Sequence, residues 1–171
     1  KRALYIPGDA TKTRGLLDWD SLRAKLGNAG SVVPGKIITI KAGHTRLDGQ
    51  HVDWHAAADF ADSYIRQGCT IQVEDVDQYF PALQNLVDST RQTIGLASRM
   101  NVAGFFSPSG SGYGLHFDAS AMWVLQLSGQ KRWQYSLSPA VHSPSENCIP
   151  TAGEQASGVN GFNVDDLVET V

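Results

Sequence analysis

The sequence predicts one domain with a helix-rich first half and a β-rich second half. The chain has 171 residues, of which 42% are apolar and 18% charged, a globular composition that allows a substantial core. Apolar residues recur at helical spacing before residue 95. Glycine and aromatic residues then become frequent and apolar residues come in short runs, as in strands. We therefore expect a helix-rich portion over 1–95 and a β-rich portion over 96–171.

The elements of the first half follow from periodicity and from the residues that end them. Proline fits the first turn of a helix and glycine its end, so Pro81–Ile94 is the clearest helix. A second amphipathic helix is predicted before Gly68. The other expected elements are a strand within Lys1–Gly8, a helix over Asp20–Leu26, a strand over Lys36–Lys41, a helix over Val52–Gln67 and a strand over Thr70–Val73.

The second half is predicted to contain short strands joined by glycine-rich turns. Ser98–Phe106 is expected to be a strand, followed by a glycine-serine loop over Ser107–Gly114. Met122–Leu127 and Lys131–Ser136 flank the turn residues Ser128 and Gly129, which predicts a β-hairpin. Ser143–Gly161 is polar and rich in glycine, proline and serine, which favours a long loop.

Composition narrows the function classes. A net charge of -3 gives no general electrostatic attraction to nucleic acid or anionic lipid, so neither partner is expected. No apolar run approaches the roughly 20 residues that span a bilayer. Cys69 and Cys148 form no disulfide framework, which favours a reducing compartment and a cytoplasmic location.

The residues that indicate chemistry are His116 and Asp118. On a strand, residues i and i+2 point to the same face, so these two side chains should project together, away from Phe117. An imidazole beside a carboxylate is two-thirds of the facial triad that binds Fe(II) in non-haem oxygenases. The His-x-Asp pattern alone is weak evidence for a metal site, because a solvent-facing strand with two polar residues can have the same pattern.

Lys131 follows on the predicted return strand of the hairpin. It alternates with Trp133 and Tyr135, so the three side chains should share one face. The lysine could reach inward as a fixed cation for a carboxylate. From spacing alone, a solvent-facing lysine beside a turn is the simpler interpretation.

Together these motifs resemble a known family. The resemblance rests on Asn101-Val102, the glycine-rich loop, His116-Phe117-Asp118 and the run from Trp123 to Trp133 with its Gly129-Gln130-Lys131-Arg132-Trp133 turn. This pattern is similar to the JmjC-type cupin-like oxygenases, especially the ribosomal oxygenase branch. The resemblance implies a mainly β fold with flanking helices, built as the double-stranded β-helix of cupins and jelly rolls.

The resemblance also implies an active site. Fe(II) would be bound by His116 and Asp118, which makes them the catalytic pair. Lys131, fifteen positions after His116, would hold the distal carboxylate of the co-substrate 2-oxoglutarate. Asn101 stands near a position where relatives carry a polar residue in the co-substrate pocket. With dioxygen, such a site hydroxylates a C–H bond.

A second histidine is needed to complete the triad. His142 is the later candidate, but it lies closer to Asp118 than the distal histidine of similar proteins does, and it precedes the polar loop. We therefore expect His142 to be a loop residue. Asp165–Val171 resembles the segment before the strand that carries the last histidine, so the chain is expected to end short of that strand.

Several substrates stay open. The resemblance favours hydroxylation of a protein or peptide side chain, with ribosomal proteins as candidates. A small-molecule or natural-product hydroxylase would use the same core, and a non-catalytic cupin-like binding module is the alternative if the distal histidine is missing. Glu74, Asp75 and Asp77 could recruit a basic peptide or form a solvated loop. A homodimer is a further open expectation.

Overall fold

The computed structural model describes residues 6–27, 37–41, 45–48, 57–138, 141–148 and 167–170. The chain forms two compact units. One consists of Thr13–Tyr113, and the other of Lys1–Lys12 together with Gly114–Val171.

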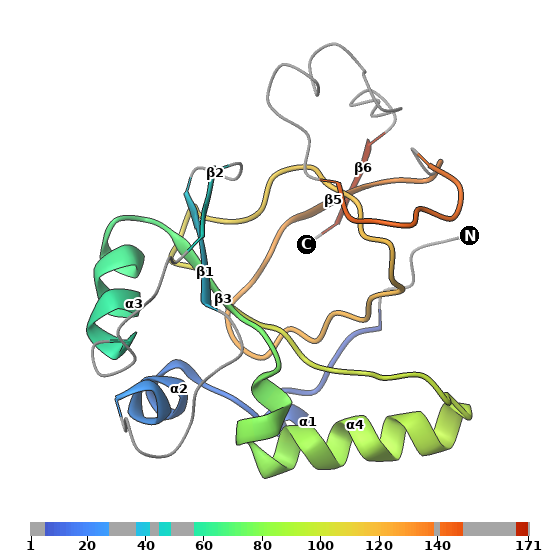
Figure 1. The fold of residues 1–171 in the computed structure, drawn as a ribbon, viewed down its shortest axis with the longest axis horizontal. Helices are drawn as coiled ribbons and strands as arrows, with labels where there is room; N and C mark the ends of the chain where they lie inside the picture. The colour runs from blue at the N-terminus through green and yellow to red at the C-terminus, as the bar shows by residue number, and fades with distance from the viewer. Residues whose placement is uncertain are drawn as a thin grey trace. The chain divides into compact units, whose positions relative to one another are not determined.

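A four-stranded antiparallel sheet organises the unit Thr13–Tyr113 (Figure 1). Its order is β2-β1-β3-β4, and β3 pairs with both β1 and β4. In this register Ile71 lies opposite Thr39 on one side and Phe106 on the other. The strands are β1 (Ile37–Lys41), β2 (Thr45–Asp48), β3 (Thr70–Val73) and β4 (Gly104–Phe106).

The helices of the described chain all lie within residues 10–94. Asp18 caps α2 by accepting a hydrogen bond from the Ser21 backbone N–H at 2.7 Å, and this bond lowers the pKa of the Asp18 carboxyl. The helices are α1 (Ala10–Thr13), α2 (Trp19–Leu26), α3 (Ala57–Arg66), the 3-10 helix η2 (Val76–Tyr79) and α4 (Pro81–Ile94).

Helix α4 has the bounds that the sequence predicts. Pro81 occupies its first turn, where a missing N–H costs nothing. Gly95 ends it in the left-handed conformation, with φ of 66°, and its N–H donates to the carbonyls of the last turn.

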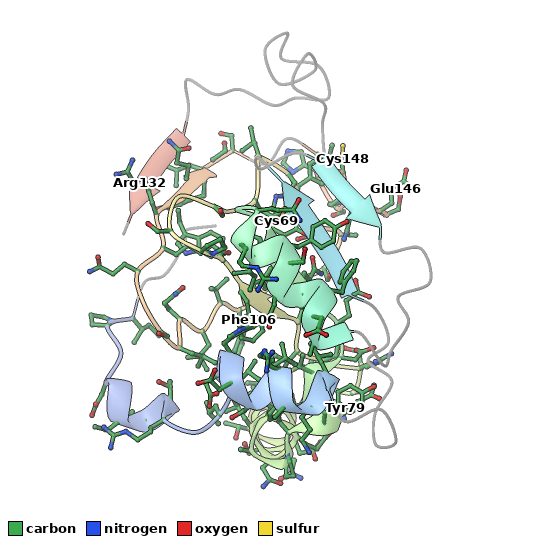
Figure 2. The ribbon with its side chains drawn as sticks, turned by 90° about the vertical axis from the view of Figure 1, so that its left-hand side faces the viewer. Cys69, Tyr79, Phe106, Arg132, Glu146 and Cys148 are labelled. Atoms are coloured by element: carbon green, nitrogen blue, oxygen red, sulfur yellow. The ribbon has the colours of Figure 1, made fainter. Side chains whose placement is uncertain are left out.

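The hydrophobic core lies in the unit Thr13–Tyr113. Helix α3 packs against β3 and α2, and α4 packs against η2. Cys69, just before β3, is fully buried (Figure 2). The core side chains come from five elements: Leu22, Leu26, Ala58, Ala61, Ile71, Val73, Val76 and Leu83. Burial of these apolar groups is the main stabilising contribution to this unit.

The other unit contains a two-stranded antiparallel sheet. Strand β5 (Trp133–Ser136) pairs with β6 (Leu167–Thr170), with Trp133 opposite Thr170. A single bridge joins Phe117 to Cys148. Among the residues described over 114–148, no side chain is fully buried.

The predicted strand Met122–Leu127 is wrong. This segment runs without strand hydrogen bonds in the structure, and β5 pairs with β6 instead of with it. Alternation and apolar content indicate an extended chain, but they do not decide which segment is its partner. The side chains from Met122 to Leu125 are consequently 52–69% exposed.

The other predicted helices and strands agree with the structure to different degrees. Thr70–Val73 is confirmed as a strand, and the helix predicted over Asp20–Leu26 begins one residue earlier. The strand predicted over Ser98–Phe106 is shorter, because only Gly104–Phe106 pairs with β3. Residues 1–5, 36, 52–56 and 149–161 lie outside the described part of the chain, so the predictions that fall on them are not tested there.

The described strands form one small antiparallel sheet in each unit. The double-stranded β-helix therefore stays a prediction. None of the helices in the described part has the length and apolar character of a membrane span.

Candidate metal centre

His116 and Asp118 lie side by side, as the sequence predicts. The His116 Nε2 atom is 3.8 Å from the Asp118 Oδ2 atom, and the two side chains are 23% and 16% exposed. Two ligands of one ion lie at most about 4.2 Å apart, twice a metal–ligand bond of roughly 2.1 Å as at zinc. The two atoms are therefore within reach of one ion, although adjacent ligands of a facial triad lie closer, about 3 Å apart, and solvent and small ligands can still reach the pair.

A backbone carbonyl orients the imidazole. The His116 Nδ1 atom lies 2.7 Å from the Gly114 carbonyl oxygen. A carbonyl only accepts, so Nδ1 carries the proton and donates it. The lone pair of the neutral ring is then on Nε2, the atom that faces Asp118. Metal-ligating histidines are commonly held in this way, because the second nitrogen fixes the tautomer and the ring plane.

The donor set suits a ferrous ion. One imidazole nitrogen and one carboxylate oxygen are the ligand types of the facial triad, which needs a second histidine. The described residues contain no group of three His, Cys, Asp or Glu side chains that could hold a metal. His142 is exposed in a bend after β5, in keeping with its prediction as a loop residue.

Lys131 is half-buried beside an aromatic ring. Its Nζ atom lies 5.5 Å from the centroid of the Trp133 ring, so the two side chains share a face as predicted. Burial lowers the pKa of the Lys131 ammonium below its ordinary value. A partly desolvated cation of this kind gains more from an incoming carboxylate than a solvated surface lysine does.

Asn101 is held by the acidic turn after β3. Its Nδ2 atom donates to Asp75 Oδ1 at 2.7 Å, and Arg99 donates to the same oxygen at 2.7 Å. This bond leaves the Asn101 amide oxygen and the second N–H of its Nδ2 atom without a hydrogen-bond partner among the described residues. Asp75 sits in the left-handed conformation, with φ of 55°, which the three-way contact supports.

Asp77 has a structural role that the sequence does not reveal. It is buried, and its Oδ1 atom accepts the backbone N–H of Val102 at 2.8 Å. Together with Asp75, it fastens residues 99–102 to the turn that begins η2. The solvated-loop interpretation of this acidic turn is therefore wrong for Asp77.

The glycine-serine loop is fastened to β3 by side-chain hydrogen bonds. Ser107 bonds Thr70 at 2.9 Å, and Ser111 donates to the Gly68 carbonyl at 2.7 Å. The Tyr113 hydroxyl donates to the Gln72 side chain. Residues 107–113 are thus held at several points within the unit Thr13–Tyr113.

Asn147 and Cys148 contact the segment that carries the pair, and their spacing in the sequence does not predict this. Phe117 exchanges backbone hydrogen bonds with Cys148, and the Asn147 side chain accepts the Ala119 N–H at 2.8 Å. Both lie in the segment predicted as a polar loop. An asparagine often bonds backbone groups, but nothing in the spacing indicates that Asn147 would bond a segment so far away in sequence.

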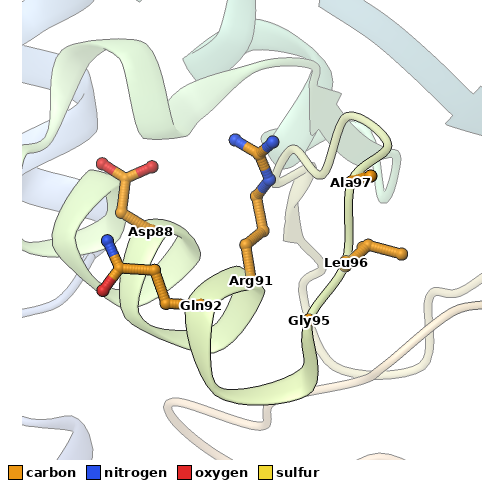
Figure 3. Close-up of a pocket in the computed structure, with 6 residues that line it drawn as sticks. All are labelled: Asp88, Arg91, Gln92, Gly95, Leu96 and Ala97. Carbon is orange, nitrogen blue, oxygen red and sulfur yellow. The ribbon is translucent and has the colours of Figure 1, made fainter.

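A hollow of about 350 Å³ lies at the end of α4 (Figure 3). Its lining is Asp88, Arg91, Gln92, Gly95, Leu96 and Ala97, so none of the predicted site residues contributes to it. The Arg91 Nε atom is buried and has no hydrogen-bond partner among the described residues.

Comparison with known proteins finds a similarity to one family over the part of the chain that holds the pair. No curated protein and no solved structure matches the chain. Residues 78–160, just under half of the chain, match the family model described as the JmjC domain. JmjC domains have a cupin or jelly-roll fold, and they typically use Fe(II) and 2-oxoglutarate as oxygenases. The match includes His116, Asp118 and Lys131, and it supports a JmjC-type cupin-like family for this chain.

Proposed function

We propose that this protein is an Fe(II)- and 2-oxoglutarate-dependent hydroxylase that acts on a protein or peptide side chain. The observation that carries the proposal is the His116–Asp118 pair, with Nε2 and Oδ2 3.8 Å apart and Nδ1 engaged by a carbonyl. The JmjC match over residues 78–160 supports the same activity.

Each of the predicted site residues would have its own role in binding the metal or the co-substrate. His116 and Asp118 would hold Fe(II), which supplies dioxygen activation coupled to decarboxylation of the 2-oxo acid when both are bound. Lys131 would hold the distal carboxylate of 2-oxoglutarate through its ammonium. Asn101 would contribute a polar contact to the co-substrate pocket. The second histidine of the triad would come from outside the described residues.

The ribosomal oxygenase branch is the favoured relative within the family, because the run from Trp123 to Trp133 resembles that branch. Ribosomal proteins are therefore the first substrates to test. The same centre would serve a hydroxylase of small molecules, and a non-catalytic binding module is the alternative if no second histidine completes the centre.

Mass spectrometry of a ribosomal-protein mixture tests the substrate class. We expect the full-length protein, supplied with Fe(II), 2-oxoglutarate and ascorbate, to add the mass of one oxygen atom to a defined peptide. His116→Ala is the control and should add none. Succinate formation without oxygen in any peptide would favour the small-molecule alternative, and the absence of both would favour the binding module.

A further inference from the structure

The segment that carries the two ligands has one described ladder contact. Phe117 and Cys148 exchange both backbone hydrogen bonds, at 3.0 and 2.9 Å, which is the hydrogen-bonded pair of an antiparallel ladder. Phe117 stands between His116 and Asp118. Fixing its peptide groups therefore fixes the side of the backbone from which both ligands project.

Asn147 adds a third bond from the same dipeptide. Its Oδ1 atom accepts the Ala119 N–H at 2.8 Å. In the antiparallel register set by Phe117 and Cys148, Asn147 lies opposite Asp118. The backbone is thus held on both sides of Asp118, at Phe117 by the bridge and at Ala119 by the amide.

This arrangement matters because the described side chains around the pair form no buried core. No side chain described over 114–148 is fully buried, so packing does not by itself hold the ligand segment in place. A metal centre needs its ligands held to within about half an ångström, and such precision comes from hydrogen bonds when packing is weak. The three bonds from Asn147 and Cys148 can provide it.

We infer that Asn147 is a positioning residue for the metal centre, acting on Asp118 through the Ala119 N–H. The inference rests on the proposed function, because it assigns Asn147 a role toward the metal that His116 and Asp118 would bind. Asn147 does not touch the metal. Without its amide oxygen, the backbone after Asp118 loses its anchor, and the carboxylate can turn away from the His116 Nε2 atom.

Titration of the full-length protein with Co(II) tests this role. Co(II) accepts the same ligand types, and its visible absorption reports coordination geometry. We expect Asn147→Leu, which removes the acceptor at similar volume, to weaken Co(II) binding about tenfold and to change the absorption spectrum at saturation. Asn147→Asp keeps an acceptor oxygen and should therefore give the wild-type spectrum. The negative charge that it adds would not by itself restore the coordination geometry.

Glu146 provides the matched control. It is the neighbouring residue in the sequence, its side chain is exposed, and it is labelled with Cys148 in Figure 2. Glu146→Ala should leave both the affinity and the spectrum at wild-type values. Circular dichroism checks folding, and Asn147→Ala takes the place of Asn147→Leu if the larger side chain prevents folding.

The outcomes separate the two claims. Equal Co(II) affinity and an identical spectrum for wild type and Asn147→Leu would overturn the positioning role and leave the metal centre intact. Equal loss in Glu146→Ala would also overturn it, because the effect would belong to the whole segment. Failure of the wild type to bind Co(II), or binding that survives His116→Ala, would overturn the proposed function and the positioning role with it.

Discussion

At the scale of single residues, Lys131 gives a pH dependence whose sign can be stated. Burial lowers its pKa, so the side chain loses its charge at a lower pH than an ordinary lysine, whose pKa is about 10.4. Only the ammonium form attracts a carboxylate. The KM for 2-oxoglutarate should therefore rise as pH increases through the lowered pKa.

Lys131→Arg is the control, because a guanidinium stays charged over this range and its KM profile should be flat. Lys131→Ala should raise the KM roughly tenfold or more at neutral pH, since a hydrogen bond to a charged group contributes about 1.5–3 kcal/mol. Steady-state kinetics between neutral and alkaline pH measure both effects. Equal KM values for wild type and Lys131→Ala at neutral pH would show that Lys131 does not hold the co-substrate.

The same pKa shift affects folding. Between the lowered folded pKa and the ordinary unfolded pKa, the unfolded chain holds more protons at Lys131 than the folded chain does. Stability therefore rises with pH across that interval. The penalty of burying the charged form is fully present below the folded pKa.

At the scale of elements, the attachment of the segment before β4 to η2 depends on a buried carboxylate. Asp77 is 6% exposed and accepts the Val102 N–H. Asp77→Ala leaves that N–H without its acceptor and should lower the free energy of unfolding by about 1–3 kcal/mol. Asp77→Asn keeps an acceptor and should lose less. Urea denaturation measures the difference, and equal stability of Asp77→Ala and wild type would contradict this role.

The end of α4 depends on a left-handed glycine. Gly95 has φ of 66°, so Gly95→Ala should destabilise the protein by about 1 kcal/mol through the backbone alone, since open space surrounds the new methyl group. Gly112 is equally open but lacks the positive φ. Gly112→Ala should stay within about 0.5 kcal/mol of wild type in the same urea experiment. If Gly95→Ala and Gly112→Ala lowered the free energy of unfolding equally, the positive φ of Gly95 would not explain the effect.

These elements also show what the sequence can predict. Helix α4 and strand β3 have the predicted bounds, because Pro81, Gly95 and the buried run after Gly68 are local signals. The adjacency of His116 and Asp118 was likewise predictable from their i and i+2 spacing, although the structure has only an isolated bridge at Phe117 and no strand there. The bridge to Cys148 and the partner of β5 join segments far apart in sequence, and no periodicity encodes which segments meet.

At the scale of the whole molecule, the core and the His116–Asp118 pair fall in different compact units. The core side chains belong to Thr13–Tyr113, and the pair belongs to the unit that contains Gly114–Val171. The structure therefore predicts unequal local stability along the chain, because amides in well-packed strands open only with the whole unit.

Hydrogen exchange measures this difference. We expect the amides of β3 to exchange slowest and those of Met122–Leu125 to exchange rapidly, because no backbone hydrogen bond joins the latter to another described residue. The Phe117 and Cys148 amides should exchange at rates between these two. Slow exchange over Met122–Leu125 would instead indicate that the hairpin predicted from the sequence forms in solution.

We propose that His116 and Asp118 form part of an Fe(II) centre that consumes 2-oxoglutarate. Succinate formation by the full-length protein with Fe(II), 2-oxoglutarate and ascorbate measures it most directly. The wild type should form succinate, while His116→Ala and Asp118→Ala should each lose this activity and bind iron more weakly. No succinate from the wild type, or equal succinate from wild type and His116→Ala, would contradict the claim.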